Sequence, residues 1–475
     1  MNGKAPHPAP VLVWFRLDLR LGDNPALSAA AASGRPVVPV FIWSPEEEGE
    51  WRAGGASLWW LKRSLAALDA SLGELGGRLV WMRGPSAGAL AELARTTGAS
   101  AVYYNRRVEP ALARQEEAVT AACAALGMEV HGFNGSLLLD PGEVRTKEGR
   151  PFQVFTPFWN ACLSRMKSVR PLAAPQGIGF PSRSPKSLDL DEPALGPGRP
   201  LGAGMEGRWA PGETGAHAAL ERFLGGALEE YGAGRDRPGG EGTSRLSPHL
   251  HFGELSPRQA WAAAESRRGA EAWQRQIVWR EFAHHLLAHF PLFPVEPLRA
   301  EFARFPWLDD RKGMEAWRRG RTGYPLVDAG MRELRATGWM HNRVRMVAAS
   351  FLTKHLLLPW REGERWFWDT LVDADLANNA FGWQWTAGCG ADAAPYFRIF
   401  NPALQAAKFD PDGAYIRRWV PELGRVPAPW LFQPWKAPRE VLERAGVEPG
   451  RTYPRPIVDH AEARERALAA HRSIR

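Results

Sequence analysis

Cysteine is nearly absent from this sequence, with only Cys123, Cys162 and Cys389 in 475 residues. Three scattered thiols exclude a disulfide framework and a zinc site built from clustered cysteines. The sequence also lacks any run of 18 or more uncharged apolar residues, and the opening segment MNGKAPHPAP has no apolar signal core. We therefore expect a cytoplasmic protein in a reducing compartment, without a membrane partner.

The common catalytic motifs are missing as well. No G-x-S-x-G, Walker A or paired glycosidase carboxylate pattern occurs, and the first apolar run is followed by RLDLRLGDN instead of G-x-G-x-x-G. This turn argues against a nicotinamide-binding domain. His284, His285 and His289 follow Glu281, but they do not form H-E-x-x-H. We therefore predict no metal site.

Basic residues and tryptophan are what the sequence has in excess. The formal net charge is +8, the pI is about 9.6, and most of the 22 tryptophans lie in the second half. The charge is compatible with an anionic partner such as nucleic acid, and equally with a basic surface that serves only solubility.

Apolar runs and helical periodicity divide the chain into two folded parts. VLVWF, VVPVFIW, RLVWMRG, AVYYN and EVHGF alternate with Ala/Leu-rich segments, which predicts a parallel, Rossmann-like α/β sheet. Asn24 before Pro25 is typical of a helix start. A stretch rich in Pro, Gly and Ser follows, and beyond it apolar residues recur at helical spacing. We predict an α/β domain over residues 1–140, a linker over 141–210 and an all-helical domain over 211–475.

Three polar segments of the second half are candidates for binding. Thr243, Ser244 and Ser247, with Arg245 between them, suit either a phosphate cradle or ordinary helix capping. Trp273, Gln276 and Arg280 share one helical stripe, and Trp339, Asn342, Arg343 and Met346 are predicted to share another. Such stripes are more typical of a core helix, but they also suit recognition of a planar heterocycle.

Together these segments resemble the DNA photolyase/cryptochrome family, in particular bacterial enzymes that repair cyclobutane pyrimidine dimers. The likeness runs over nearly the whole chain. It rests on WFRLDLRLGDNPAL, EGTSRLSPHLHFGELSPRQ, WREF, TGYPLVDAGMRELRATGWMHNRVRM, WREGERWFWDTLVDADLANN and GWQWTAGCGADAAPYFRIFNPALQAAKFDPDG.

The resemblance implies FAD in the helical domain, held by residues at matching positions. Asp373 would pair with Arg345, Asp375 would bond the sugar or ring edge, and Asn379 would face flavin nitrogen five, where an amide suits a fully reduced flavin. The full set implied for the cofactor is Tyr231, Thr243, Ser244, Arg245, Leu246, Ser247, Trp273, Gln276, Arg280, Asn342, Arg345, Asp373, Asp375 and Asn379.

The resemblance also implies DNA containing pyrimidine dimers as the partner of a monomeric enzyme. The lesion would be flipped out of the duplex into a pocket, because photolyases cannot reach it within the base stack. Photoexcited reduced flavin would then donate an electron that opens the dimer. Residues implied for the substrate are Trp279, Trp385, Met346, Arg235, Arg343 and Arg398, and those implied for catalysis are Asn379, Gln276, Asn342, Trp383, Trp360 and Trp307.

Trp383, Trp360 and Trp307 match the family's chain of indoles that carries electrons from the surface to oxidised flavin. Trp317 is an alternative to Trp307 as the surface end of this chain. The family also implies an antenna pigment, for which we expect methenyltetrahydrofolate before a deazaflavin or FMN. Gln276 stands where many relatives have Glu. Two other activities remain open, those of a cryptochrome photoreceptor and of a (6-4) photolyase, although Asn342 stands where the latter typically has His.

Overall fold

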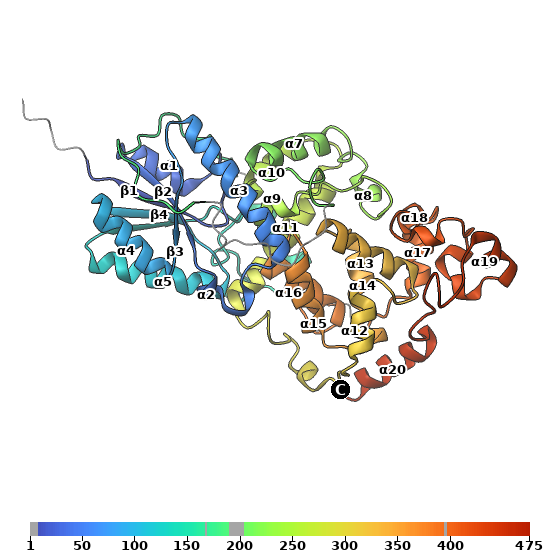
Figure 1. Cartoon of the computed structure of the whole chain (residues 1–475). Helices are drawn as coiled ribbons and strands as arrows, with labels where there is room; N and C mark the ends of the chain where they lie inside the picture. Colours follow the sequence, from blue (N-terminus) through green and yellow to red (C-terminus); the bar gives the residue numbers. More distant parts are fainter. Residues whose placement is uncertain (1–7, 167–168, 190–203, 394–396) are drawn as a thin grey trace, which may run out of the picture.

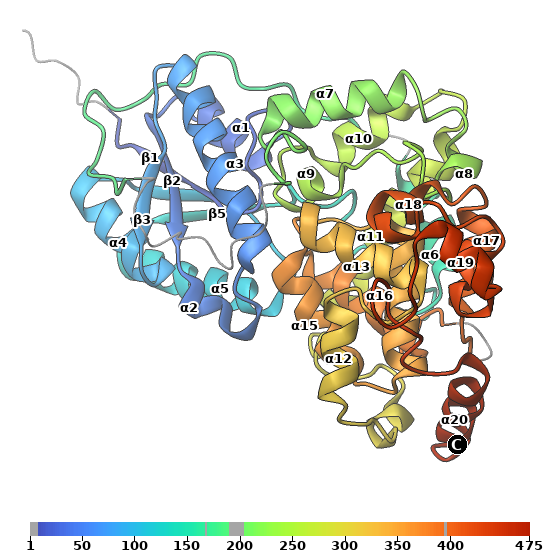
Figure 2. The same ribbon diagram turned by 45° about the vertical axis from the view of Figure 1, so that its right-hand side comes forward.

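The computed structural model describes residues 8–166, 169–189, 204–393 and 397–475. An α/β part at the N-terminal end lies beside a larger helical part (Figures 1 and 2). All five predicted strands are present in one parallel sheet of order β3-β2-β1-β4-β5. The strands are β1 (Val11–Phe15), β2 (Val37–Trp43), β3 (Val80–Arg83), β4 (Ala101–Asn105) and β5 (Glu129–Phe133). The predicted α/β class is therefore confirmed.

The strands are apolar on both faces because helices cover both faces of the sheet. Val11, Val13 and Phe15 belong to the core under α1 (Pro25–Ala32) and α3 (Gly55–Glu74). Leu12 and Trp14 point the other way, into the core formed with α4 (Ser86–Thr97) and α5 (Pro110–Ala125). A short helix, α2 (Pro45–Glu48), and the 3-10 turn η1 (Gly49–Trp51) follow β2.

The predicted start of α1 is confirmed in detail. The Asn24 side chain accepts a hydrogen bond from the backbone N–H of Leu27 at 3.1 Å, and Pro25 occupies the first turn. Asn105 at the end of β4 donates to Asn24 Oδ1 at 2.8 Å. The cap thereby ties α1 to the carboxyl end of the sheet.

The second half is helical, as predicted, and its helices pack around two cores. None of the helices in the ranges given above is long and apolar enough to cross a membrane. The helices that follow the sheet are α6 (Phe155–Arg165), which precedes the second half, and then α7 (Glu213–Leu224), α8 (Tyr231–Gly234), α9 (Ser247–His251), α10 (Pro257–Ala264), α11 (Ala270–His289), α12 (Arg311–Arg318), α13 (Pro325–Thr337), α14 (Asn342–Ser350), the π-helical turn η5 (Phe351–His355), α15 (Trp360–Thr370), α16 (Leu376–Ala387), α17 (Pro402–Phe409), α18 (Ala414–Trp419), α19 (Arg439–Ala445) and α20 (His460–Arg472), with 3-10 turns η4 (Ala300–Arg304), η6 (Pro421–Leu423), η7 (Trp430–Phe432) and η8 (Pro434–Lys436).

The predicted helical stripe containing Trp339 is wrong at its N-terminal end. Helix α14 begins at Asn342, and His341 is its N-cap, with a side chain that accepts from the Arg343 N–H at 3.2 Å. Trp339 therefore precedes the helix. The spacing of apolar residues did not reveal that the helix begins only after His341. Histidine is a less common N-cap than Ser, Thr, Asp or Asn, so it gave no signal of a helix start.

The predicted linker, residues 141–210, includes helix α6, which packs against α11. Residues 171–189 contain neither helix nor strand, and residues 190–203 lie outside the described ranges. The domain limits at residues 140 and 210 stay predictions.

Two fully buried carboxylates join the α/β part to the helical part. Asp23 pairs with Arg258 at 2.9 Å and accepts the Leu172 N–H at 2.8 Å. Glu254 accepts from the Trp60 indole N–H at 2.9 Å and from the Gly212 N–H at 2.7 Å. Removal of one partner from a buried pair leaves the other charge uncompensated, so this joint is costly to open.

Candidate cofactor and substrate site

A cavity of about 270 Å³ lies in the helical part, bounded by α9, α11, the start of α14 and the segment before α16. Leu250, His251, Ile277, Trp339, Met340 and Asn378 contribute to its walls. The remaining lining residues are all in the predicted cofactor set, of which only Asn379 is missing: Tyr231, Thr243, Ser244, Arg245, Leu246, Ser247, Trp273, Gln276, Arg280, Asn342, Arg345, Asp373 and Asp375.

Helix α11 forms one wall through the stripe Trp273, Gln276 and Arg280. These residues are spaced by three and four positions, so their side chains leave the helix on one face. Trp273 and Arg280 are buried, and Arg280 donates to the Ser136 carbonyl at 3.1 Å. The stripe therefore presents an indole, an amide and a held guanidinium to the cavity.

The hydroxyl segment, residues 243–247, lies at another wall and runs into the first residue of α9. Ser247 donates to Asp373 Oδ2 at 2.6 Å, and Arg245 adopts the left-handed backbone conformation with φ of 53°. The Arg245 guanidinium lies 5.0 Å from the centre of the Trp339 ring, and its buried Nε has no hydrogen-bond partner among the described residues. Hydroxyls beside a guanidinium with an unused donor suit phosphate oxygens.

Asp373 and Arg345 form the ion pair that the family resemblance implies. Arg345 Nη2 donates to Asp373 Oδ1 at 3.0 Å and Oδ2 at 2.8 Å, while Nε donates to the Met340 carbonyl at 2.7 Å. Asp373 is buried. The pair fixes a charged edge of the cavity, because moving either side chain away would leave the charge of the other uncompensated.

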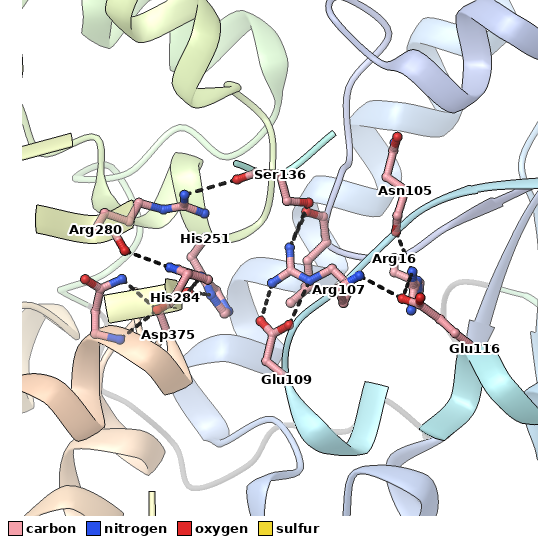
Figure 3. A network of polar contacts seen from close by, with 12 residues as sticks. Arg16, Asn105, Arg107, Glu109, Glu116, Ser136, His251, Arg280, His284 and Asp375 are labelled. Atoms are coloured by element: carbon pink, nitrogen blue, oxygen red, sulfur yellow. Dashed lines mark hydrogen bonds and ion pairs between the residues drawn. The ribbon is translucent and has the colours of Figure 1, made fainter. Parts of the chain in front are cut away.

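Asp375 is a buried anion whose two carboxylate oxygens have different partners, the start of α16 and a pair of histidines (Figure 3). Its Oδ1 caps α16 by accepting from the Asn378 N–H at 2.9 Å and the Asn378 amide at 2.7 Å. Its Oδ2 lies 3.3 Å from His284 Nε2 and 3.6 Å from His251 Nδ1. Burial alone would raise the pKa of Asp375, but His284 and His251 hold it well below its usual range.

These residues fit FAD in kind. Hydroxyls and an arginine suit the phosphates, indoles suit the flat rings, and two fixed carboxylates suit the N–H groups of a flavin edge or sugar hydroxyls. The cavity thus offers a separate chemistry for each part of a dinucleotide.

Asn379, the predicted partner of flavin nitrogen five, lies one position away from the lining residue Asn378. It is buried on α16, and its amide nitrogen donates to the Glu364 carbonyl at 3.0 Å, which turns the amide oxygen away from Glu364. The Glu364 side chain is fully buried, and this burial raises its pKa well above the usual range. Burial therefore favours the uncharged form of the acid that lies behind Asn379.

None of the six predicted substrate residues is among those that line the cavity, whereas Asn342, from the predicted catalytic set, is. Asn342 is exposed at its rim, and the Met346 sulfur lies 3.9 Å from the Asn342 amide nitrogen. Trp279 stacks on Phe155, with ring centres 3.5 Å apart and planes at 5°. Trp385 donates from its indole N–H to the Asp392 carbonyl at 3.1 Å. One face of Trp279 is thus covered, so only its other face is available for stacking.

The predicted DNA-binding arginines lie in different settings. Arg343 is half-buried and pairs with Asp236 at 2.7 Å. Arg235 lies 5.5 Å from the Tyr231 ring centre, and Arg398 is exposed just after the undescribed residues 394–396. All three roles stay predictions.

The three predicted chain tryptophans become more exposed from α16 outward. Trp383 is 2% exposed, Trp360 is 4% exposed and Trp307 is half-buried, and all pack with one core cluster. Trp317 has no exposed surface and meets Trp383 edge-on at 6.2 Å. The alternative that Trp317 is a surface exit is therefore wrong, since a buried ring cannot meet an external donor.

Sequence reasoning missed Glu109, His251 and the role of His284 beside Asp375. His251 lay inside the segment already singled out for its hydroxyls, so its nearness to a site could have been suspected. Glu109 gave no such signal, because it comes from the α/β part and meets the helical part only through the fold.

The chain is similar to known proteins over its whole length. Models described as "DNA photolyase" and "FAD binding domain of DNA photolyase" match residues 11–176 and 273–473. Over 474 residues the chain is 50% identical to a deoxyribodipyrimidine photo-lyase of Agrobacterium fabrum, covering 98% of each. It is 43% identical to Cryptochrome-1 of Arabidopsis thaliana, covering 96% of this chain and 69% of that protein.

A solved structure extends this likeness to three dimensions. The crystal structure of a bacterial class III photolyase from Agrobacterium tumefaciens matches with a TM-score of 0.96 and 48% identity. The match covers 100% of this chain and 99% of that one.

The ion pair at the cavity edge gives a test of cofactor binding. Arg345→Ala should weaken FAD binding by about tenfold, because Asp373 would remain buried without its cation. Calorimetric titration of FAD into the cofactor-free protein measures this change. Arg335→Ala, an exposed arginine on α13 outside the cavity, is the matched control and should bind FAD as the unaltered protein does. Equal affinity in the two variants would contradict the assignment.

Proposed function

Because the chain belongs to the DNA photolyase/cryptochrome family, we propose that it is a light-dependent lyase that splits cyclobutane pyrimidine dimers in DNA. The observation that carries the proposal is the cavity in which nearly every predicted cofactor residue meets. The deoxyribodipyrimidine photo-lyase relative at 50% identity supports the same reaction. A cytoplasmic monomer is the setting that we propose for it.

The residues of the cavity would hold FAD and keep its surroundings fixed. Thr243, Ser244 and Arg245 would bind the phosphates, and Asp373 and Asp375 would bind polar groups of the sugar and ring. When bound and reduced, FAD supplies the light-driven electron that opens the dimer and receives it back. The protein needs no nucleophile for this chemistry, so its contribution is position and electrostatics.

The rim would receive the flipped dimer. Asn342 is exposed and can bond to base carbonyls, Met346 lies beside it, and Trp279 and Trp385 offer indole surface. Arg235, Arg343 and Arg398 would bind phosphates around this opening, in keeping with the net charge of +8.

The likeness to a plant cryptochrome favours a second candidate function, that of a blue-light photoreceptor without repair activity. The two functions share FAD binding, so FAD content does not separate them. Their difference lies in turnover of damaged DNA.

Repair is therefore the deciding measurement. Purified protein with reduced FAD should restore thymine dimers in an oligonucleotide under blue or near-ultraviolet light, and should leave them intact in darkness. Liquid chromatography of the digested DNA measures the thymines released. Restoration of (6-4) products alone would identify the protein as a (6-4) photolyase. If neither lesion were repaired, the photoreceptor function would be the remaining candidate.

The tryptophan chain gives a separate test of electron entry. Trp307→Phe should keep FAD content, since a similar aromatic ring preserves most of the packing. Light-driven reduction of oxidised FAD should fall severely, while dimer repair from chemically reduced FAD should hardly change. Absorption spectroscopy follows the reduction. Trp430→Phe alters another half-buried indole that packs on the same core cluster. In this control variant, FAD should be photoreduced at the native rate. A native rate in Trp307→Phe would remove that residue from the chain.

We also propose an antenna site in a second cavity, of about 370 Å³, between the two parts. It lies at the carboxyl ends of β1 and β2, near the point where the strand order reverses, which is where open α/β sheets bind ligands. Trp51 and Trp368 line it edge-on to each other at 5.4 Å, and burial raises the pKa of the lining Glu48 to about 7. Methenyltetrahydrofolate is the pigment that we propose, with its acidic tail toward Arg114 at the wall.

Spectra test the pigment site directly. The purified protein should absorb in the near ultraviolet beyond its flavin bands, and Trp51→Ala should lose this absorption because half of the aromatic pair is gone. FAD absorption should persist, since Trp51 lies outside the cofactor cavity. Chromatography of the released pigment distinguishes a folate from a deazaflavin or FMN, and either of the latter would overturn the folate assignment.

A further inference from the structure

His284 is a buried histidine whose two ring nitrogens both face oxygen atoms (Figure 3). It is 2% exposed on α11, its Nδ1 lies 2.9 Å from the Arg280 carbonyl oxygen, and its Nε2 lies 3.3 Å from Asp375 Oδ2. A carbonyl and an ionised carboxylate can only accept hydrogen bonds. A neutral imidazole has one N–H, so with Nδ1 bonded to the carbonyl its bare Nε2 would face the negative carboxylate oxygen.

We propose that His284 is a buried imidazolium, protonated on both ring nitrogens, that positions the Asp375 carboxylate behind the cofactor cavity. In this role His284 acts through Asp375, which lines the cavity and caps α16. Nδ1 then donates to the Arg280 carbonyl, and the positive ring lies at ion-pair distance from the Asp375 carboxylate, although neither Nε2 nor Oδ2 has an aligned hydrogen bond among the described residues.

The charges around His284 balance when it is a cation. Glu109 and Asp375 supply two negative charges, and Arg107 neutralises Glu109 by donating to both carboxylate oxygens, with Nε at 3.1 Å from Oε2. Asp375 then needs one cation, and His284 at 3.3 Å lies nearer to it than His251 at 3.6 Å. Arg280 and Glu281 offset each other at 3.3 Å. The titratable groups facing His284 from its own helix and from neighbouring elements are Glu109, Arg107, His251, Asp375, Arg280 and Glu281.

The directions of the carboxylate pKa values agree with this geometry. Burial would raise the pKa of Glu109, but Arg107 and then His284 lower it. The pKa of Asp375 is lowered by the same imidazole. Two buried acids are thus kept ionised by cations that are themselves buried.

A bound divalent metal is the competing explanation. The ligand atoms of Glu109, His284 and Asp375 lie within 4.8 Å of one another, and a metal-bound histidine also donates its other N–H to a carbonyl. However, both oxygens of Glu109 already accept from Arg107. A divalent ion beside Arg107 would also leave an excess of positive charge among two carboxylates. The geometry therefore favours the proton over the metal.

The imidazolium lies between the two cavities. Asp375 lines the cofactor cavity, Glu109 lines the interdomain cavity, and His251 lines both. Because His284 offsets the negative charge of Asp375 at the wall, a negative charge in the cofactor cavity, as carried by reduced flavin, is repelled less. This last step rests on the proposed function, whereas the protonation of His284 does not.

His285, the next residue on α11, differs from His284 in its hydrogen bonding and serves as a comparison within the same protein. His285 Nε2 accepts the Phe152 N–H at 3.0 Å, so this nitrogen carries no proton. Burial lowers the pKa of His285 to about 3. Two adjacent buried histidines should therefore differ in charge at the same pH.

Nitrogen NMR of the histidine-labelled full-length holoprotein tests this directly. At neutral pH, both ring nitrogens of His284 should carry hydrogen, while His285 should show one bare nitrogen. His284→Gln and His285→Gln assign the signals by their disappearance. A bare nitrogen on His284, or one equivalent of metal by elemental analysis, would overturn the proposal.

Two substitutions separate charge from packing. His284→Gln should bind FAD about tenfold more weakly and shift its midpoint potential to more negative values, because the cation is lost. His284→Arg keeps a positive charge and should restore the potential. His289→Gln changes a half-buried histidine that contacts only the Pro141 carbonyl among the described hydrogen bonds, and should change neither quantity.

The outcomes are distinguishable from a failure of the proposed function. An unchanged potential in His284→Gln would overturn the electrostatic role. An equal loss in the Gln and Arg variants would show that only the shape of the imidazole matters, which also overturns it. Absence of dimer repair would refute the lyase activity and leave the NMR result standing.

Discussion

The Asp375 carboxylate must stay ionised inside the protein, and much of the site depends on this. One oxygen caps α16, the helix that carries Asn379, Trp383 and Trp385, and the other faces His284 and His251. Without the histidines, burial would favour the protonated acid, which accepts fewer hydrogen bonds at the cap. The start of α16, the cavity wall and the position of the indoles are therefore linked through one ion pair.

The α/β part reaches this ion pair through Glu109 and its partner Arg107. The cations and acids that converge on Asp375 come from the end of the sheet and from α9 and α11, so the site is complete only when the α/β and helical parts are joined. Asp23 with Arg258 and Glu254 with Trp60 fasten the same joint from other positions. The α/β part thus contributes to the cofactor site without lining its cavity.

The sheet, its order of strands along the chain and the helical second half could be predicted because each depends on local pattern. The stripe of Trp273, Gln276 and Arg280 could be predicted for the same reason, since three residues on one helix share a face by geometry. Glu109 beside His284 could not, because 175 positions separate them and only tertiary packing brings them together. The prediction of where α14 starts was wrong for a local reason, namely the unusual N-cap residue His341.

The pairing of charges indicates what kind of site this is. Asp373 has Arg345, Asp375 has His284, and Glu109 has Arg107, while Glu364, the buried acid behind Asn379, is kept uncharged by its burial. An enzyme that transfers protons needs a group whose two protonation states lie close in energy. Here burial raises the pKa of Glu364, while His284 and Arg107 lower the pKa values of Asp375 and Glu109 against the effect of burial, so each of these acids is driven toward one state. Such an arrangement suits a reaction in which an electron moves and comes back, because fixed charges need not reorganise while it does.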